Sequence, residues 1–141
     1  MFDKILLPTD GSEFSEHEVE RAIKALSDDG EIIILSVAPK LEATTPFQSK
    51  KNIARMNKGF YDEAHANVDR MARRFDKHVK VKRMVVRGIP SETIVEVAEK
   101  EDVDLIIIAA SGKSGLQKFF IGSVAEKVLK STERDVLLIH N

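Results

Sequence analysis

The stretch that decides the fold spans residues 105–123 and reads LIIIAASGKSGLQKFFIGS. Its first six residues are apolar without interruption, which is typical of a strand covered on both faces, as the strands of a parallel sheet are. The glycines that follow would then lie at the carboxyl end of that strand. Because ligands in open parallel sheets bind beyond this edge, the stretch predicts a fold class and the place of a site.

Apolar runs and amphipathic helical patterns alternate along the rest of the chain. Strands are expected over residues 2–7, 31–37, 79–86, 104–110 and 135–140. Between them, apolar residues recur at helical spacing, and the first such stripe consists of Val19, Ala22, Ile23 and Leu26. The alternation predicts an α/β fold, namely a doubly wound five-stranded parallel sheet with helices on both faces, in one domain over residues 1–141.

The composition excludes several classes of function. The chain has 22 basic and 23 acidic residues, so it lacks the basic excess with which general nucleic-acid binders hold phosphates. It has no cysteine, which excludes disulfides, thiolate catalysis and cysteine-ligated metals and fits a reducing compartment. The longest apolar run, residues 105–110, is too short to cross a membrane, and the first residues do not resemble a signal peptide. We therefore expect a cytoplasmic protein without nucleic-acid or membrane partners.

Residues at the ends of the first two strands are candidates for a binding site. Pro8, Thr9 and Asp10 follow the first strand, and the Asp10 carboxylate could accept hydrogen bonds from amino or hydroxyl groups of a ligand. The other interpretation is that Asp10 is a turn residue, since Asp-Gly is a common turn pair. Val37, at the end of the second strand, is small and apolar enough to line a flat slot.

The glycine-rich stretch has the features of an anion site. Gly112 lets the backbone approach a ligand closely, and Lys113 could add a cation. Gly122 and Ser123 open the last helix, whose N-terminal N–H groups and partial positive charge suit phosphate. Loop formation or helix capping explains each residue alone, but together they favour a phosphate site. A Walker A loop is excluded because Ile107 stands where that motif needs its first glycine, and G-x-G-x-x-G is absent.

Two further features concern a long loop and the choice of metal. Residues 38–50 form a stretch too long for a usual βα connection, so they are a surface loop or a lid over a ligand. Asp10 could hold a magnesium ion through water, and no other metal site is predicted. The four histidines show no metal-binding spacing and are expected at the surface; they are His17, His65, His78 and His140.

These residues resemble the universal stress protein family. That family's nucleotide-binding pattern is G-x-x-G, nine further residues and G-[S/T], and Gly112, Gly122 and Ser123 match its later positions. Ala109 stands where the pattern has its first glycine, although its backbone N–H is retained. The resemblance covers nearly the whole chain and includes the opening at 2–12, the strand at 103–108 and the last strand at 136–139.

The resemblance implies a strand order of 3-2-1-4-5 and an adenine nucleotide, ATP or AMP, at the carboxyl edge. In nucleotide-binding members, adenine and its sugar are surrounded by the positions that match Pro8, Thr9, Asp10 and Val37. Ribose and phosphates are held by the positions that match Gly112, Gly122, Ser123 and Val124, and Ala109 and Lys113 are added here as candidates. Members act in stress responses and commonly dimerise through their last strands, here Val136, Leu137, Leu138 and Ile139.

Three functions are open at this point. The first is a signalling module whose state depends on bound ATP or AMP. The second is a slow ATPase that would use Asp10 and Lys113, although no second carboxylate, arginine finger or base is identifiable from the spacing. The third is a protein-interaction dimer that has lost nucleotide, which Ala109 alone favours. A phosphorylated receiver domain is disfavoured, because Asp10 is the one acid found where a pair is needed.

Overall fold

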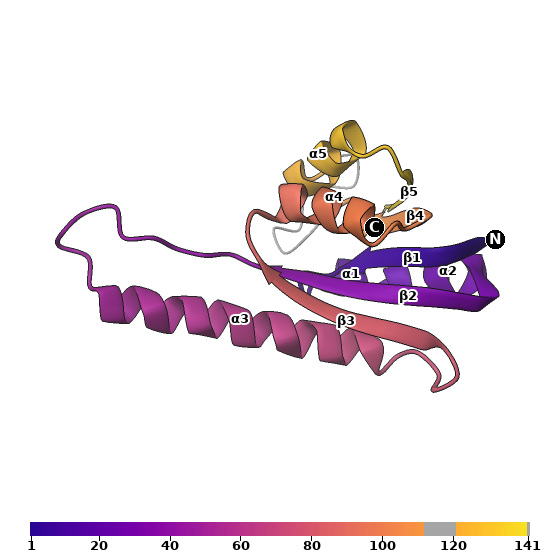
Figure 1. Cartoon of the computed structure of the whole chain (residues 1–141), viewed down its shortest axis with the longest axis horizontal. Helices are drawn as coiled ribbons and strands as arrows, with labels where there is room; N and C mark the ends of the chain where they lie inside the picture. Colours follow the sequence, from indigo (N-terminus) through magenta and orange to yellow (C-terminus); the bar gives the residue numbers. More distant parts are fainter. Residues whose placement is uncertain (112–120, 141) are drawn as a thin grey trace.

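The computed structural model of the chain describes residues 1–111 and 121–140. Five strands form one sheet in the order β3-β2-β1-β4-β5 with every neighbouring pair parallel (Figure 1). The elements are β1 (Phe2–Pro8), α1 (Glu13–Glu16), α2 (Glu18–Ala25), β2 (Leu26–Ala38), α3 (Lys50–Ala72), β3 (Lys80–Arg87), α4 (Pro90–Lys100), β4 (Leu105–Ala109), α5 (Ser123–Ser131) and β5 (Asp135–Ile139). The predicted fold class and strand order are confirmed.

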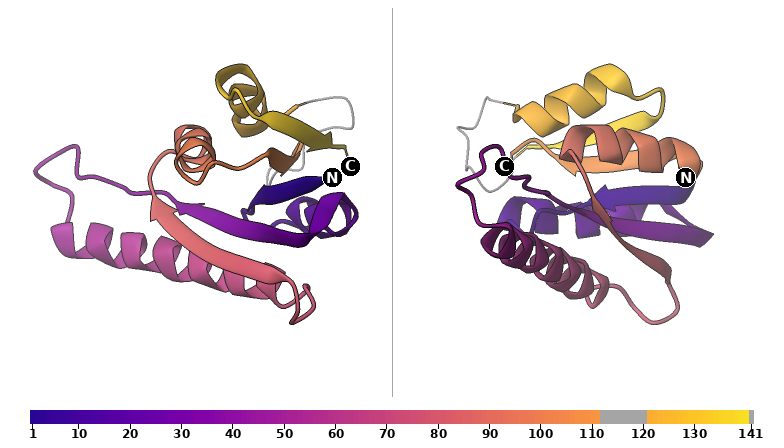
Figure 2. Two further views of the ribbon diagram at one scale, coloured as in Figure 1. Left: turned by 45° about the vertical axis from the view of Figure 1, so that its right-hand side comes forward. Right: turned by 60° about the vertical axis from the view of Figure 1, so that its left-hand side comes forward.

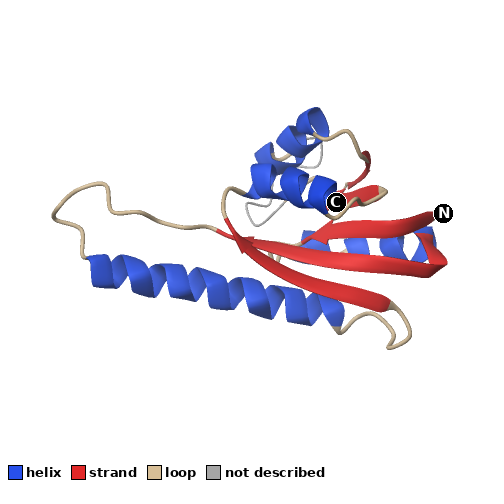
Figure 3. Ribbon diagram, in the orientation of Figure 1, coloured by secondary structure: helices blue, strands red, loops and turns tan. Residues whose placement is uncertain are grey.

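The helices cover both faces of the sheet, as Figures 2 and 3 show. Alternate residues of a strand point to opposite faces, so β1 sends Ile5 and Leu7 towards α2 and α3, and Leu6 towards α4 and α5. All three side chains are fully buried. Burial of one such side chain contributes about 1.5 to 3 kcal/mol, so β1 is an anchor for both layers.

The chain between α2 and β2 differs from the expectation. The second strand begins at Leu26, directly after α2, and not at Glu31, because Leu26 pairs with Phe2 at the start of β1. Leu26 therefore belongs to the sheet and not to the helical stripe. Ile23, another member of that stripe, is 56% exposed.

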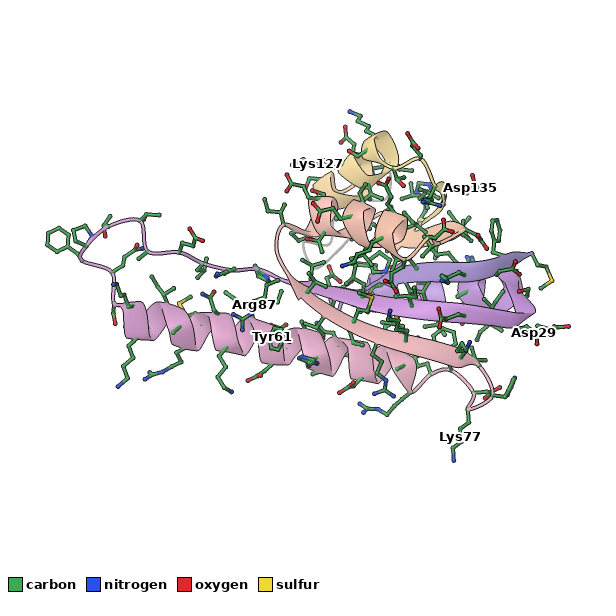
Figure 4. All side chains as sticks on the ribbon, viewed as in Figure 1. Asp29, Tyr61, Lys77, Arg87, Lys127 and Asp135 are labelled. Carbon is green, nitrogen blue, oxygen red and sulfur yellow. The ribbon has the colours of Figure 1, made fainter. Side chains whose placement is uncertain are left out.

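The helix α3 is only partly packed on the sheet. Its C-terminal half buries Ala64, Val68 and Met71, whereas its N-terminal half and the preceding loop extend beyond the sheet (Figure 1). At the boundary between the halves, the Arg87 guanidinium lies over the Tyr61 ring, 4.6 Å from its centroid (Figure 4). Among the described residues, no helix is both long enough and apolar enough to span a membrane.

Candidate functional site

A cavity of about 570 Å³ opens at the carboxyl edge of the sheet. It lies where β1 stands between β2 and β4, which is the point at which the strand order reverses. Doubly wound folds bind their ligands at this switch point, because the connections leave it in opposite directions and open a crevice. The cavity is lined by the ends of β1, β2 and β4 and by the beginnings of α2, α4 and α5.

The wall next to β1 is made of polar side chains that form hydrogen bonds within the protein. The Thr9 hydroxyl lies 2.9 Å from the Ser15 hydroxyl and also accepts the Gly11 N–H at 3.1 Å. The Ser36 hydroxyl donates to the Thr9 carbonyl at 2.9 Å. Thr9, Ser15 and Ser36 are buried. The fold therefore fixes this wall through its own hydrogen bonds, and we call it the β1 wall, made of Thr9, Asp10, Ser15 and Glu18.

A tight turn sets the path of the chain out of β1. Gly11 has a φ of +82°, a conformation that side chains disfavour, and a Cβ added there would overlap the Asn67 amide. Arg70 of α3 donates to the Gly11 carbonyl at 3.2 Å and to Asn67 Oδ1 at 3.1 Å. The structure shows that Arg70 holds the turn beneath the site.

The structure confirms Asp10 as a turn residue, and its contact with a ligand stays a prediction. Its Oδ1 accepts the Ser12 N–H at 2.9 Å, which is the hydrogen bond of an Asx turn. The residue is also exposed and lines the cavity. Groups of three or more His, Asp or Glu side chains placed to hold a metal are absent from residues 1–111 and 121–140.

The opposite wall consists of small residues and backbone, and we call it the α5 wall. It comprises Ala109, Ala110, Ser111 and the first turn of α5 with its preceding glycine, residues 122–125. The Gly122 N–H donates to the Ala110 carbonyl at 2.7 Å, so it joins α5 to β4 and is not offered to a ligand. The next N–H groups, of Ser123, Val124 and Ala125, have no acceptor within the helix. With the helix dipole, they suit an anion.

Apolar side chains close the cavity between these walls. Pro8, Leu35 and Val37 come from the ends of β1 and β2, and Pro90 and Ile94 come from α4. Neither of the two α4 residues was predicted from the sequence to line the site. Their signal was available, because only two residues separate the end of β3 from the start of α4, so α4 must begin at the same edge.

Glu18 is a further residue that sequence reasoning missed. It opens α2, lines the cavity, and is 1% exposed. Its Oε2 accepts the Ala109 N–H at 3.3 Å. Burial, and to a smaller extent the carboxylates of Asp10 and Glu16, raises the pKa of Glu18 well above its ordinary value, against the opposing effect of the Ala109 N–H. The N–H that was expected to serve a ligand at Ala109 is therefore bound within the protein.

The sequence-predicted residues converge on this one cavity. It is lined by Pro8, Thr9, Asp10, Val37, Ala109, Gly122, Ser123 and Val124. Gly112 and Lys113 lie outside the described residues. In the part of the chain that the structure describes, no residue between 38 and 50 lines the cavity, so a lid has no support there. That these residues contact a nucleotide stays a prediction, and the four histidines are exposed as expected.

Comparisons of the sequence and of the fold with known proteins find similarity to the same protein family. The model of the universal stress protein family matches residues 1–140. Universal stress protein MJ0577 of Methanocaldococcus jannaschii is 34% identical over 155 residues, which cover 99% of this chain and 95% of that protein. The solved structure of MJ0577 superposes with a TM-score of 0.86 at 31% identity and covers 99% of this chain and 96% of that one.

Two solved structures of lower identity share the fold and contain nucleotides. One is an Arabidopsis thaliana family protein, At3g01520, with AMP bound; it has a TM-score of 0.65 and 17% identity, and the match covers 96% of this chain and 90% of that one. The other is a universal stress protein in complex with cAMP, with a TM-score of 0.62 and 24% identity over 99% of this chain and 97% of that one.

Proposed function

Because the chain belongs to the universal stress protein family, we propose that it binds an adenine nucleotide in the cavity between the β1 wall and the α5 wall. The observation that carries the proposal is the pairing of two unlike surfaces across one cavity of about 570 Å³. An apolar slot suits a purine, and the first turn of α5 suits phosphate. Nucleotides are the common ligands that combine these two chemistries.

The lining residues suggest how the nucleotide lies. Pro8, Val37 and Ile94 would contact the adenine ring, and Asp10 would accept a hydrogen bond from a ribose hydroxyl or from the adenine amino group. The N–H groups of Ser123 and Val124 would donate to phosphate oxygens. A magnesium ion would arrive with a triphosphate and reach Asp10 through water, because magnesium keeps several of its waters when it binds phosphates. We expect the nucleotide to act as a signal in the cytoplasm during stress.

Two proteins of this fold make AMP the first ligand to test, with ATP beside it. At3g01520 is described with AMP bound, and another protein of this fold is described in complex with cAMP. Both ligands contain an adenine, a ribose and a phosphate. The chemistry of the cavity in this chain agrees with these three parts.

The sharpest test places a negative charge at the start of α5. Ser123→Glu puts a carboxylate where we expect phosphate, so the Kd for ATP and AMP should rise about tenfold or more. The same carboxylate interacts favourably with the helix dipole, so the free energy of unfolding should be unchanged or raised by about 0.3 to 1 kcal/mol. Isothermal titration calorimetry and urea denaturation measure the two effects separately.

Ser131→Glu is the matched control, because it makes the same change at the exposed C-terminal end of the same helix. It should leave the Kd unchanged and lower the stability slightly, since an acid is unfavourable at that end. Absence of ATP and AMP binding by the wild-type protein at millimolar nucleotide would end the proposal. Equal Kd values for the wild type and Ser123→Glu would remove α5 from the site.

We also propose that two copies pair through β5. The sheet has two edges, and β3 carries four cations, Lys80, Lys82, Arg83 and Arg87, which discourage edge pairing. Between Val136 and Ile139, β5 carries no charge, and Leu137 is 39% exposed. An unguarded apolar edge favours a two-fold pairing of identical strands.

Leu137→Lys tests this interface. The charge should shift a dimer towards monomer in light scattering at micromolar concentration. Leu129→Lys is the control. Leu129 on α5 is 38% exposed, nearly the same as Leu137, so the two substitutions differ mainly in their location. A wild-type monomer at high micromolar concentration would contradict the β5 dimer.

A further inference from the structure

The Glu18 carboxyl is the one polar group of the β1 wall that the fold leaves half satisfied. Its Oε2 accepts the Ala109 N–H, whereas its Oε1 is buried and has no hydrogen-bond partner among residues 1–111 and 121–140. The side chain lines the cavity at the point where α2 meets β4. A buried polar atom without a partner destabilises the fold, so the chain retains an unfavourable group at the place where a ligand would lie.

The surroundings of Glu18 favour its neutral form. The charged groups that act on it in the described part of the chain are two further acids, Asp10 after β1 and Glu16 in α1. The charge of Glu16 is balanced by Arg70 of α3 at 3.4 Å and by Arg74, just beyond the end of that helix, at 2.9 Å. The β4 side contributes the Ala109 N–H alone. Burial is the largest influence and opposes ionisation.

We propose that Glu18 binds the nucleotide directly, by donating a hydrogen bond from a proton on Oε1 to a ribose or phosphate oxygen. The inference rests on the proposed function. The proton belongs on Oε1, because Oε2 already accepts an N–H. A neutral carboxyl is both donor and acceptor, so it can serve an oxygen-rich ligand that a carboxylate in the same place would repel. Protonated Glu18 thereby makes the affinity for nucleotide depend on pH.

The pH dependence has a definite sign. At low pH Glu18 is protonated and donates, so binding is strongest. As the pH rises through the elevated pKa of Glu18, the carboxylate loses its donor and places a negative charge beside the nucleotide, so the affinity falls. If Glu18 instead bound as a carboxylate that accepts ribose hydroxyls, the affinity would rise with pH. The two arrangements therefore predict opposite slopes.

The experiment compares three proteins by calorimetry with AMP between pH 5.5 and 8.5. Glu18→Gln keeps the shape and a donor but cannot ionise, and Glu18→Ala removes the group. We expect the wild type and Glu18→Gln to bind within about threefold at the lowest pH and to diverge by about tenfold or more as the pH rises. The ratio of their Kd values at each pH cancels the titration of the AMP phosphate. Glu18→Ala should bind about tenfold more weakly than Glu18→Gln throughout.

Glu13→Gln is the matched control, because Glu13 is an exposed acid of α1 that does not line the cavity. Its Kd should follow the wild type at every pH. Nucleotide binding that is equal in the wild type and both Glu18 variants would overturn this inference and leave the proposed function intact. Wild-type affinity that rises with pH relative to Glu18→Gln would overturn it as well. Absence of binding by the wild type would overturn the proposed function and this inference with it.

Discussion

The two walls of the cavity are built on opposite plans. In the β1 wall, the polar side chains of Thr9 and Ser15 are satisfied by each other and by nearby backbone. In the α5 wall, small side chains expose backbone, and the first N–H groups of the helix have no acceptor within it. The hydrogen bonds of the β1 wall form without a ligand, whereas the N–H groups at the start of α5 remain available to one. Damage to the first should therefore reduce stability, and damage to the second should reduce affinity.

The largest expected effect is on the turn beneath the β1 wall. Gly11→Ala forces a side chain into a φ of +82° and against the Asn67 amide, so the free energy of unfolding should fall by about 2 to 3 kcal/mol. Urea denaturation measures the change.

Gly59→Ala is the control for the same substitution. Gly59 lies within α3, and an added Cβ meets no atom within 4 Å, so alanine should raise the stability by about 0.5 to 1 kcal/mol. Equal effects of the two substitutions would mean that the turn is not a fixed part of the β1 wall.

The next effect concerns Glu18, the exception within the β1 wall. Because folding raises its pKa, the stability that its proton contributes is complete below the ordinary glutamate pKa and is lost as the pH rises through the elevated value. The stability of the wild type relative to Glu18→Gln should therefore fall with rising pH, by at most about 1.4 kcal/mol per pH unit. Urea midpoints at pH 5 and pH 8 check this. A difference independent of pH would show that Glu18 titrates normally.

The smallest effects compare one serine from each wall. Ser15→Ala removes hydrogen bonds to Thr9 and to the Ser12 carbonyl and should lower the stability by about 1 to 2 kcal/mol. Ser123→Ala removes an exposed hydroxyl and should change the stability by less than about 0.5 kcal/mol. Thermal denaturation of both variants decides the comparison. Reversed magnitudes would assign the fixed wall to α5.

The sheet could be predicted from the sequence because its signal is local. Runs such as Ile106–Ile108 are buried on both faces and are apolar throughout, so composition alone identifies a parallel strand. The boundary of β2 could not be predicted in this way. Leu26 fits a helical stripe equally well, and its place in the sheet depends on pairing with Phe2, which is 24 residues away in the chain.

The candidate site also contains residues that could be predicted from the local sequence and residues that could not. Residues at the carboxyl ends of strands, such as Thr9 and Ala109, were predicted to line the site because the topology brings those positions together. Glu18 and Arg70 were missed because each acts through a contact between distant segments. The partner of Glu18 is Ala109 on β4, and Arg70 reaches back from α3 to Gly11. In the sequence, both residues have the pattern of charged side chains on the solvent-exposed face of an amphipathic helix.

The uneven support of α3 has a consequence for how this helix opens. With 23 residues, it is about 35 Å long at 1.5 Å per residue, yet its buried apolar side chains, such as Val68 and Met71, all lie in its C-terminal half. Backbone amides near Ile53 should exchange with deuterium by local fraying, and those near Met71 only by global unfolding. A single continuous helix would thus display the full range of protection factors in the domain, graded from one end to the other.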